Sequence, residues 1–170
     1  MYSQDVRFLD DDDGFLNMKK GTVIKGKSGS LYRVYCNLGK GTFGQAFVCR
    51  GLDTGEFFAV KIIRSKPEYV IQGENELRML SWINDVDAND DFHLIRLSDY
   101  LFIHNHHFYL SPLYSFTLFQ LMQTNAQGLP FSLVHHIAVS VGIHTLSSYL
   151  VTPITVFSSS QWSDSYRCQT

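Results

Sequence analysis

A glycine-rich segment carries the most chemically specific pattern in the sequence. The stretch LGKGTFGQAF, from Leu38 to Phe47, places Gly39, Gly41 and Gly44 within six residues. Because glycine lacks a Cβ atom, the backbone of such a segment approaches a ligand closely and presents its N–H groups to phosphate oxygens. The pattern therefore indicates a phosphate-binding loop, and the elements around it decide which kind of loop it is.

The segment after the glycines excludes two common phosphate-binding folds. In a dinucleotide-binding fold the glycines open a helix, whose N-terminus holds the pyrophosphate. Here FGQAFVCRG is typical of a strand and runs to a turn at Gly51 and Gly55, and no helix opens. A Walker-type loop needs Gly-Lys-Ser/Thr after four spacers, and that motif is absent. We therefore predict a hairpin whose tip folds over phosphates, with Phe43 at the tip shielding them from water.

A lysine and a glutamate follow the glycine loop. The segment EFFAVKII, residues 56–63, is dense in strand-forming residues and carries Lys61. A partly buried lysine needs an opposite charge to hold it in the ionised form. Glu76, on the predicted helix that follows, is the candidate. We expect Lys61 to reach the phosphates and Glu76 to hold it there.

The flanking elements predict an antiparallel sheet and one long helix. Residue alternation and strand-forming composition predict five strands, at residues 31–38, 43–51, 56–63, 94–103 and 107–114. The sequence SKPE predicts the start of the helix with a capping box, in which Ser65 and Glu68 satisfy free backbone N–H groups. Gly73 lies inside this helix at a cost in helix propensity, which indicates close packing against a neighbour.

The chain divides into four segments by composition. We expect a polar, acidic and flexible lead-in over residues 1–30 and the sheet with its helix over 31–114. Residues 115–141 are predicted to begin a helical region, with a short helix from Thr117 to Gln123 and a longer one from about Ser132. Residues 142–170 form a divergent, serine-rich tail that we expect to be poorly ordered.

Taken together, these residues resemble the N-terminal lobe of a eukaryotic protein kinase. The resemblance rests on the glycine loop, on AVK at residues 59–61 and on Glu76. The stretches GTFGQ, AVKIIRSKPEY and NHHFYL narrow it to the DYRK family and its yeast-type growth-regulating branch, over residues 31–141. The resemblance implies an α+β fold, with a five-stranded antiparallel sheet plus one helix, followed by the first helices of the C-lobe.

The same resemblance implies a function. Members of this family are serine/threonine kinases, some with tyrosine autophosphorylation, which transfer the γ-phosphate of ATP to protein hydroxyls with the help of magnesium. Lys61 would contact the α- and β-phosphates and pair with Glu76, and Ala59 would contact adenine. Ala46 stands where valine is usual, so the pocket stays apolar but becomes smaller. The implied ATP site comprises Leu38, Gly39, Lys40, Gly41, Thr42, Phe43, Gly44, Ala46, Ala59, Lys61 and Glu76.

Two departures from the family pattern concern adenine binding and catalysis. Ser111 and Pro112 stand about where the family has its gatekeeper and an acidic residue, and Pro112 has no N–H to donate. A kinase also needs a catalytic-loop Asp, a metal-binding Asn and the Asp of D-F-G. The sequence contains neither H-x-D followed by Asn, nor D-F-G, nor A-P-E. We therefore assign no catalytic residue and no metal ligand, and expect no phosphotransfer by this chain alone.

Two hypotheses remain open at this point. The chain is either a truncated kinase product or a non-catalytic, pseudokinase-like module that binds nucleotide or a partner. Because a kinase sheet normally packs against a complete helical lobe, we expect an exposed apolar patch that recruits a kinase or a chaperone.

Composition limits the other function classes. The net charge of −2 gives no whole-chain attraction to nucleic acid or to an anionic membrane surface. No apolar run approaches the roughly 20 residues that span a bilayer, and the acidic start MYSQDVRFLDDDDG has no apolar segment of a secretory signal. We therefore expect an intracellular protein, in the cytoplasm and/or the nucleus.

Two clusters of potential metal ligands lack the required spacing. An EF-hand loop built on the acidic run at 10–13 would carry Lys20 where a bidentate Glu is needed. The histidines at 104, 106 and 107 lie at a predicted hairpin turn with no carboxylate or thiol at ligand spacing. Neither cluster predicts a metal site.

Overall fold

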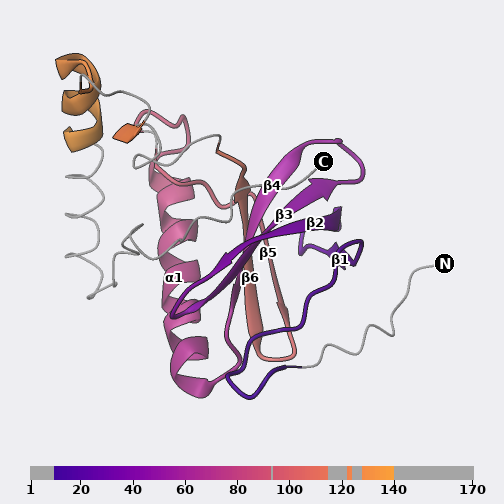
Figure 1. Cartoon of the computed structure of the whole chain (residues 1–170). Helices are drawn as coiled ribbons and strands as arrows, with labels where there is room; N and C mark the ends of the chain where they lie inside the picture. The colour runs from indigo at the N-terminus through magenta and orange to yellow at the C-terminus, as the bar shows by residue number, and fades with distance from the viewer. Residues whose placement is uncertain (1–9, 93, 115–121, 124–127, 140–170) are drawn as a thin grey trace.

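A twisted antiparallel sheet and one long helix make up the computed structural model, which describes residues 10–92, 94–114, 122–123 and 128–139 (Figure 1). The sheet has the strand order β1-β2-β3-β4-β6-β5, and each neighbouring pair is antiparallel. The elements are β1 (Val23–Lys25), β2 (Leu31–Lys40), β3 (Gly44–Gly51), β4 (Phe57–Ile63), α1 (Pro67–Val86), β5 (Asp99–Ile103) and β6 (His106–Pro112).

The predicted fold class is confirmed, and the sheet has one strand more than expected. The five predicted strands correspond to β2 through β6. The sixth, β1, pairs with the start of β2, with Ile24 opposite Tyr32. It has three residues, which is too short for alternation to reveal, and it lies in the segment that we expected to be a flexible lead-in.

The described part of the lead-in, residues 10–30, packs against the sheet. Leu16 and Ile24 are each only 2% exposed and belong to the main hydrophobic cluster of the sheet. The side-chain N–H of Gln45, which is itself buried, donates to the backbone carbonyl of Leu16. The polar composition of this segment gave no indication that two of its apolar side chains belong to the main cluster.

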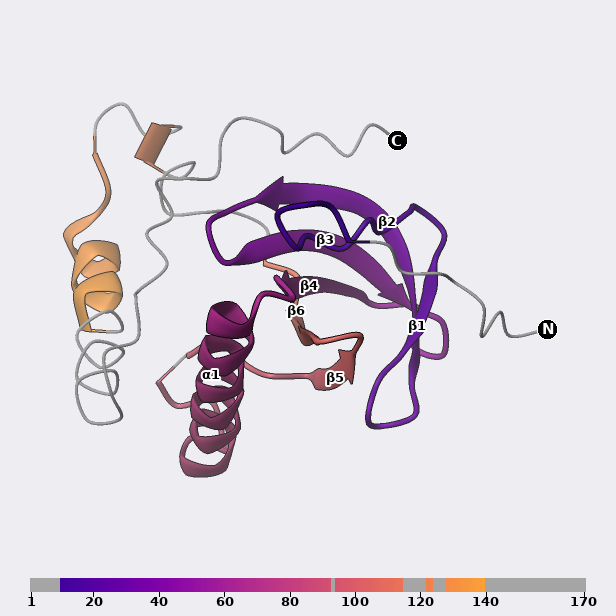
Figure 2. The same cartoon turned by 90° about the horizontal axis from the view of Figure 1, so that it is seen from below.

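The sheet buries both faces, in different ways. One face carries the larger cluster, to which β4 contributes Val60 and Ile62 and β6 contributes Phe108 and Leu110. The other face carries Ile63 and Tyr109, which pack with Leu80 of α1. Figure 2 shows α1 lying along this second face, beside β5 and β6. Side chains alternate between the faces along each strand, so the residues that share a face with Ile63 also face the side of α1.

The start of α1 differs from the predicted capping box. Lys66 is the N-cap residue, no side chain caps the first turn, and proline follows at the first helical position, where its missing N–H costs nothing. The Ser65 hydroxyl instead donates to Asp10 Oδ2 at 2.5 Å. The capping-box prediction is wrong because a distant carboxylate takes the hydroxyl that would cap the helix.

The C-terminal half of the chain is described in part. Residues 131–139 are helical, in agreement with the helix predicted from about Ser132. The predicted helix at 117–123 lies outside the described residues except for its last two, which are helical, and the predicted tail at 142–170 lies outside them altogether. Among the described helices, none combines the length and apolar character needed to cross a membrane.

Candidate functional site

The glycine segment forms the hairpin that joins β2 to β3. Gly39 has φ of 149°, which side-chain-bearing residues rarely adopt, and the Gly41 N–H donates to the Gly44 carbonyl at 2.8 Å. A Cβ atom on Gly44 would lie 2.1 Å from the backbone oxygen of Ile62 in β4. Gly44 is therefore required by the close approach of the neighbouring strand, whatever the hairpin binds.

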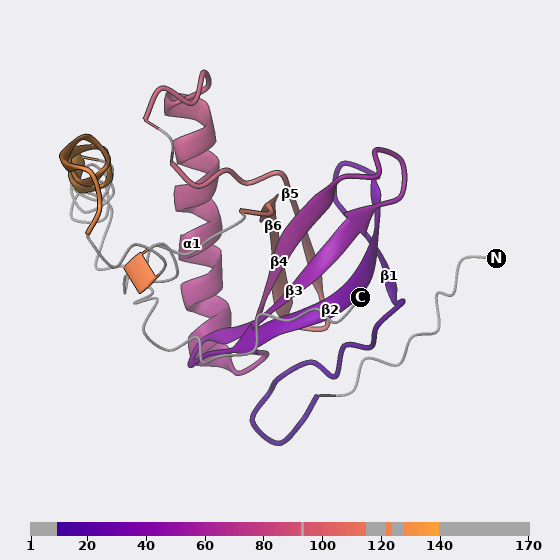
Figure 3. The same ribbon diagram turned by 45° about the horizontal axis from the view of Figure 1, so that its top comes forward.

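The tip of this hairpin contacts the first turn of α1. The Phe43 ring packs edge-on against Tyr69, with ring centroids 6.0 Å apart, and the Phe43 carbonyl accepts the backbone N–H of Arg64 at 3.1 Å. Figure 3 shows the β2–β3 hairpin reaching the N-terminal end of the helix. Phe43 is half-buried by these contacts, and its role over bound phosphates stays a prediction.

Three predicted site residues share one face of the sheet. Ala46 of β3 lies opposite Lys61 of β4, and Val48 lies opposite Ala59. Because Ala59 and Lys61 are two residues apart on one strand, their side chains point to the same side, which is the side of α1. The small side chains of Ala46 and Ala59 leave room on this face next to the lysine. Along this face the hairpin comes first, then Ala46 with Lys61, and then Ala59.

Lys61 and Glu76 meet as predicted. Lys61 Nζ lies 2.6 Å from Glu76 Oε1 and 2.8 Å from Oε2, so the ammonium group is held by both carboxylate oxygens. The side chains retain 24% and 30% of their exposure, respectively. The pair is therefore fixed in position and still reachable by a charged ligand. Charge-assisted hydrogen bonds of this length are among the stronger polar contacts in proteins.

Close packing of α1 against the sheet brings Glu76 to this position. A Cβ atom on Gly73 would lie 2.7 Å from Cδ2 of His107 and 2.9 Å from the hydroxyl oxygen of Tyr109. Both of these residues belong to β6, the neighbour of β4. The prediction that Gly73 allows close packing is confirmed, and the partner is the strand next to Lys61.

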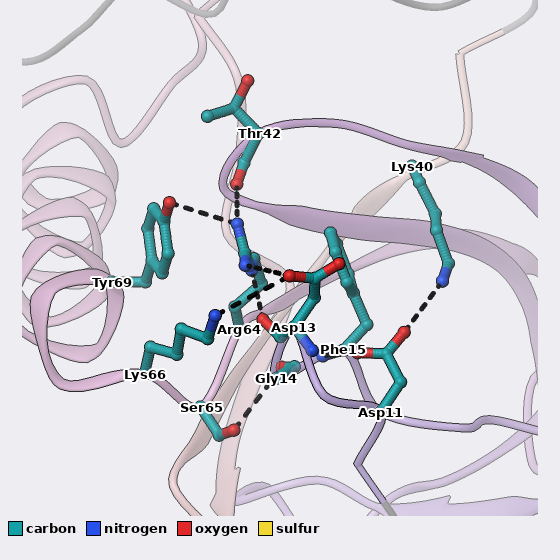
Figure 4. A network of polar contacts seen from close by, with 10 residues as sticks. All are labelled: Asp11, Asp13, Gly14, Phe15, Lys40, Thr42, Arg64, Ser65, Lys66 and Tyr69. Carbon is teal, nitrogen blue, oxygen red and sulfur yellow. Dashed lines mark hydrogen bonds and ion pairs between the residues drawn. The ribbon is translucent and has the colours of Figure 1, made fainter.

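Arg64, directly after β4, joins the hairpin to two other elements (Figure 4). Its Nη1 atom donates to the Thr42 carbonyl and to the Tyr69 hydroxyl, each at 3.1 Å, and its Nε donates to the Asp13 carbonyl at 2.7 Å. The guanidinium also lies over the Phe15 ring, 4.7 Å from its centroid. One side chain, only 11% exposed, thus links the glycine hairpin, α1 and the N-terminal segment.

Residues 10–16 form an acidic turn that packs beside the glycine hairpin. Lys40 Nζ lies 3.4 Å from Asp11 Oδ2 and 4.5 Å from the centroid of the Phe15 ring (Figure 4). The Phe15 N–H also donates to Asp11, and this bond is the main cause that lowers the pKa of the Asp11 carboxyl. The acidic run therefore packs against the hairpin through its side chains and backbone.

A buried histidine ties the same turn to the sheet. His106 is fully buried, with Nδ1 2.5 Å from the Ile63 carbonyl and Nε2 2.9 Å from Asp10 Oδ1. Burial acts to raise the pKa of Asp10, but its hydrogen bonds with Ser65 and His106 and the His106 charge outweigh burial and lower it. The sequence showed no carboxylate at ligand spacing from this histidine, and the structure brings Asp10 to it from 96 residues away.

Ser111 and Pro112 lie at the end of β6. Ser111 pairs with Ala59 and Pro112 pairs with Phe58, both in β4. The backbone N–H of Leu113 points back to the Phe57 carbonyl at 3.4 Å. The two unusual residues therefore continue the β4–β6 ladder at the end of the face that carries the two alanines.

Some site residues were not found from the sequence. Neither Arg64 nor Tyr109 belongs to a sequence motif. The acidic turn has no motif either, and its run of aspartates was the only signal that pointed to it. Among the described residues, no group of three His, Cys, Asp or Glu side chains lies close enough to hold a metal ion.

Comparison with known proteins gives consistent matches to one group of kinases. The chain is 37% identical over 133 residues to the probable serine/threonine-protein kinase yakA of Dictyostelium discoideum, which covers 72% of this chain and 9% of the relative. It is 31% identical over 134 residues to the human dual specificity tyrosine-phosphorylation-regulated kinase 4, covering 78% and 25%. It is 37% identical over 106 residues to the dual specificity protein kinase YAK1 of Saccharomyces cerevisiae, covering 61% and 13%. No protein-family model matches the chain.

The sheet, the helix and the lysine–glutamate pair define a protein-kinase N-lobe. The matches place this lobe among the DYRK and YAK1 kinases, so the chain is a DYRK-like kinase segment. It spans a quarter or less of the length of these relatives.

Proposed function

We propose that this chain is the ATP-binding lobe of a serine/threonine or dual-specificity protein kinase. The observation that carries the proposal is the contact between Lys61 Nζ and both oxygens of Glu76. In kinases the strand lysine must be paired with a helix glutamate before it can hold the phosphates of ATP. Here that pairing is present on the face that also carries Ala46 and Ala59.

Each residue is given a role in ATP binding that suits its position. The glycine hairpin covers the phosphates with its backbone N–H groups, and Lys61 neutralises their charge. Ala59 and Ala46 form the apolar floor for adenine, with Ser111 beside Ala59 at the far end. The acidic turn supports the hairpin from outside through Lys40 and Arg64.

We further propose that the 170-residue chain binds ATP without transferring its γ-phosphate. Positioning and metal ions supply most of the catalysis in phosphoryl transfer, and the sequence contains no catalytic-loop, D-F-G or A-P-E motif. Phosphorylation of protein hydroxyls with magnesium is then an activity of the complete family members. An intracellular location, in the cytoplasm and/or the nucleus, is part of the proposal.

A second candidate is a non-catalytic module that regulates a partner kinase or is held by a chaperone. The exposed apolar side chains favour it, because Ile71, Trp82 and Val86 of α1 are 62%, 43% and 56% exposed. Complete kinases place such surfaces against other parts of the protein. Nucleotide binding alone does not distinguish the two candidates, because both allow it. Lack of phosphotransfer together with a stable partner complex favours the module.

Thermal denaturation of the chain with increasing ATP and magnesium tests nucleotide binding. A ligand that binds only the folded state at 100 times its dissociation constant adds about 2.7 kcal/mol to the free energy of unfolding. We expect the wild type to be stabilised by ATP and the Lys61→Ala variant to lose most of that stabilisation. Lys25→Ala, on β1 away from the site, is the control and should respond like the wild type.

Two results oppose the proposal. No stabilisation of the wild type by millimolar ATP contradicts nucleotide binding by this chain. Equal stabilisation of the wild type and Lys61→Ala contradicts the site, because the nucleotide would then bind elsewhere.

A further inference from the structure

Tyr109 joins the strand beside Lys61 to the helix that carries Glu76. It lies directly opposite Lys61 in the β4–β6 ladder. Its hydroxyl donates to the backbone carbonyl of Gly73 at 2.5 Å, three residues before Glu76 in α1. Tyr109 therefore neighbours Lys61 through the sheet and Glu76 through the helix.

The tyrosine ring has a fixed orientation. It is 4% exposed and lies against two rings, with centroids 6.2 Å from Tyr100 and 6.0 Å from His107 and interplanar angles of 17° and 22°. Burial, and to a smaller extent the charge of Glu76, raises the pKa of the Tyr109 hydroxyl. The hydroxyl therefore remains a hydrogen-bond donor. A ring held in this way carries its hydroxyl to one point on the helix.

The helix side of the contact is equally constrained. Any Cβ atom at position 73 would collide with the Tyr109 hydroxyl and with His107. Two side chains of one face of β6 thus meet the helix at Gly73, His107 by packing and Tyr109 by its hydrogen bond, and Glu76 follows three residues later.

We propose that Tyr109, through its bond to the Gly73 carbonyl, is the positioning residue that sets the register between Glu76 and Lys61. The inference rests on the proposed nucleotide site for its functional meaning, while the pairing itself is independent of nucleotide. In this chain the helix is held in the pairing position by the sheet. All the groups required, namely β4, β6 and α1, lie within residues 57–112.

The first test measures the Lys61–Glu76 interaction without nucleotide. Chemical denaturation of the full chain gives the unfolding equilibrium constants of the wild type, Lys61→Met, Glu76→Gln and the double variant, and hence a coupling factor. We expect a factor of about five for a partly exposed bidentate pair. The same cycle is then repeated in Tyr109→Phe and Tyr100→Phe backgrounds. Tyr100 is the matched control, because its hydroxyl lies 3.3 Å from His107 Nδ1 in the same stack.

The positioning role predicts a selective loss of coupling. In the Tyr109→Phe background the factor should fall below about two, and in Tyr100→Phe it should keep its wild-type value. A Tyr109→Phe protein that is less stable but retains the full coupling factor would show that Tyr109 only packs the core. A coupling factor near one in the wild type also overturns the proposal, because there would be no pair to position.

The second test measures nucleotide affinity by equilibrium titration. Loss of one buried hydrogen bond that orients the pair should weaken ATP binding by about 3- to 10-fold in Tyr109→Phe and leave Tyr100→Phe unchanged. If neither the wild type nor any variant binds ATP, but the coupling factor falls in Tyr109→Phe as expected, the proposed function fails and the positioning role stands. If ATP binds equally well to wild type and Tyr109→Phe, the functional part of this inference is overturned.

Discussion

Lys61 Nζ lies within 2.8 Å of both carboxylate oxygens of Glu76, across the gap between a strand and a helix. Every element that holds the two residues lies between Phe57 and Pro112. The pair is thus assembled by the N-lobe itself, on the face that carries Ala46 and Ala59. This arrangement has consequences for stability as well as for binding, because the same contacts support the core and the site.

Leu16→Ala tests whether the N-terminal segment is part of the folded lobe. Leu16 is 2% exposed within the main cluster, so we expect its truncation to lower the free energy of unfolding by about 2–4 kcal/mol. The control is Leu52→Ala, the same chemical change at a side chain that is 40% exposed, which should cost less than about 0.5 kcal/mol. Urea denaturation measures both values.

The comparison of Leu16→Ala with Leu52→Ala decides whether the N-terminal segment is part of the folded lobe. Equal and small effects would mean that residues 10–16 do not pack on the sheet in solution, and the support of the glycine hairpin by the acidic turn would be lost with them.

Asp99 should give the lobe an acid-sensitive contribution to stability. Its Oδ2 accepts the Ser28 and Tyr32 hydroxyls at 2.5 Å and 3.0 Å, and its Oδ1 accepts the Tyr100 N–H at 2.8 Å. Burial acts to raise the pKa of this carboxyl, but the hydrogen bonds from these three residues outweigh burial and lower the pKa below 3.8.

The sign of the pH dependence follows from that lowered pKa. As the pH falls below about 4, the unfolded chain binds a proton at Asp99 before the folded chain does, so acid favours unfolding. We expect the stability of the wild type to fall more steeply from pH 5 to pH 2 than that of Asp99→Asn. Denaturant titrations at each pH measure the two slopes, and parallel curves would exclude a contribution from Asp99.

Gly44→Ala separates the structural requirement for glycine from phosphate binding. The added Cβ would lie 2.1 Å from the Ile62 carbonyl oxygen, so the β3–β4 ladder must shift. We expect a loss of about 3 kcal/mol without any ligand. Gly21→Ala is the control, because it has a positive φ of 88° but meets nothing within 4 Å, and it should cost about 1 kcal/mol. A loss at Gly44 no larger than the loss at Gly21 would argue that the strands shift easily and that the clash does not explain Gly44.

The sequence was informative where side-chain type and local spacing determine structure. The strand that continues after Gly44 distinguished this hairpin from a strand-to-helix loop, and the spacing of Lys61 and Glu76 predicted a contact that the structure confirms. Gly73 was recognised as a close-packing position because glycine inside a helix is otherwise unfavourable.

The remaining features depend on contacts between distant parts of the chain. Asp10 takes the Ser65 hydroxyl that was predicted to cap α1, and 55 residues separate the two. Tyr109 looked like an ordinary strand residue until the helix carbonyl opposite it was known. The acidic run was assigned to a flexible lead-in because no local pattern shows that Leu16 and Phe15 beside it pack against the sheet and Arg64.

The most direct measurement is chemical labelling of Lys61 by an ATP derivative that carries an acyl group on its terminal phosphate. Such a reagent acylates lysines that lie beside the bound phosphates, and mass spectrometry of the digested chain identifies them. We predict that Lys61 is acylated and that excess ATP lowers its labelling at least tenfold, whereas any labelling of Lys25 on β1 does not respond to ATP. Labelling of Lys61 that equals that of Lys25, or that persists in excess ATP, would contradict the nucleotide site.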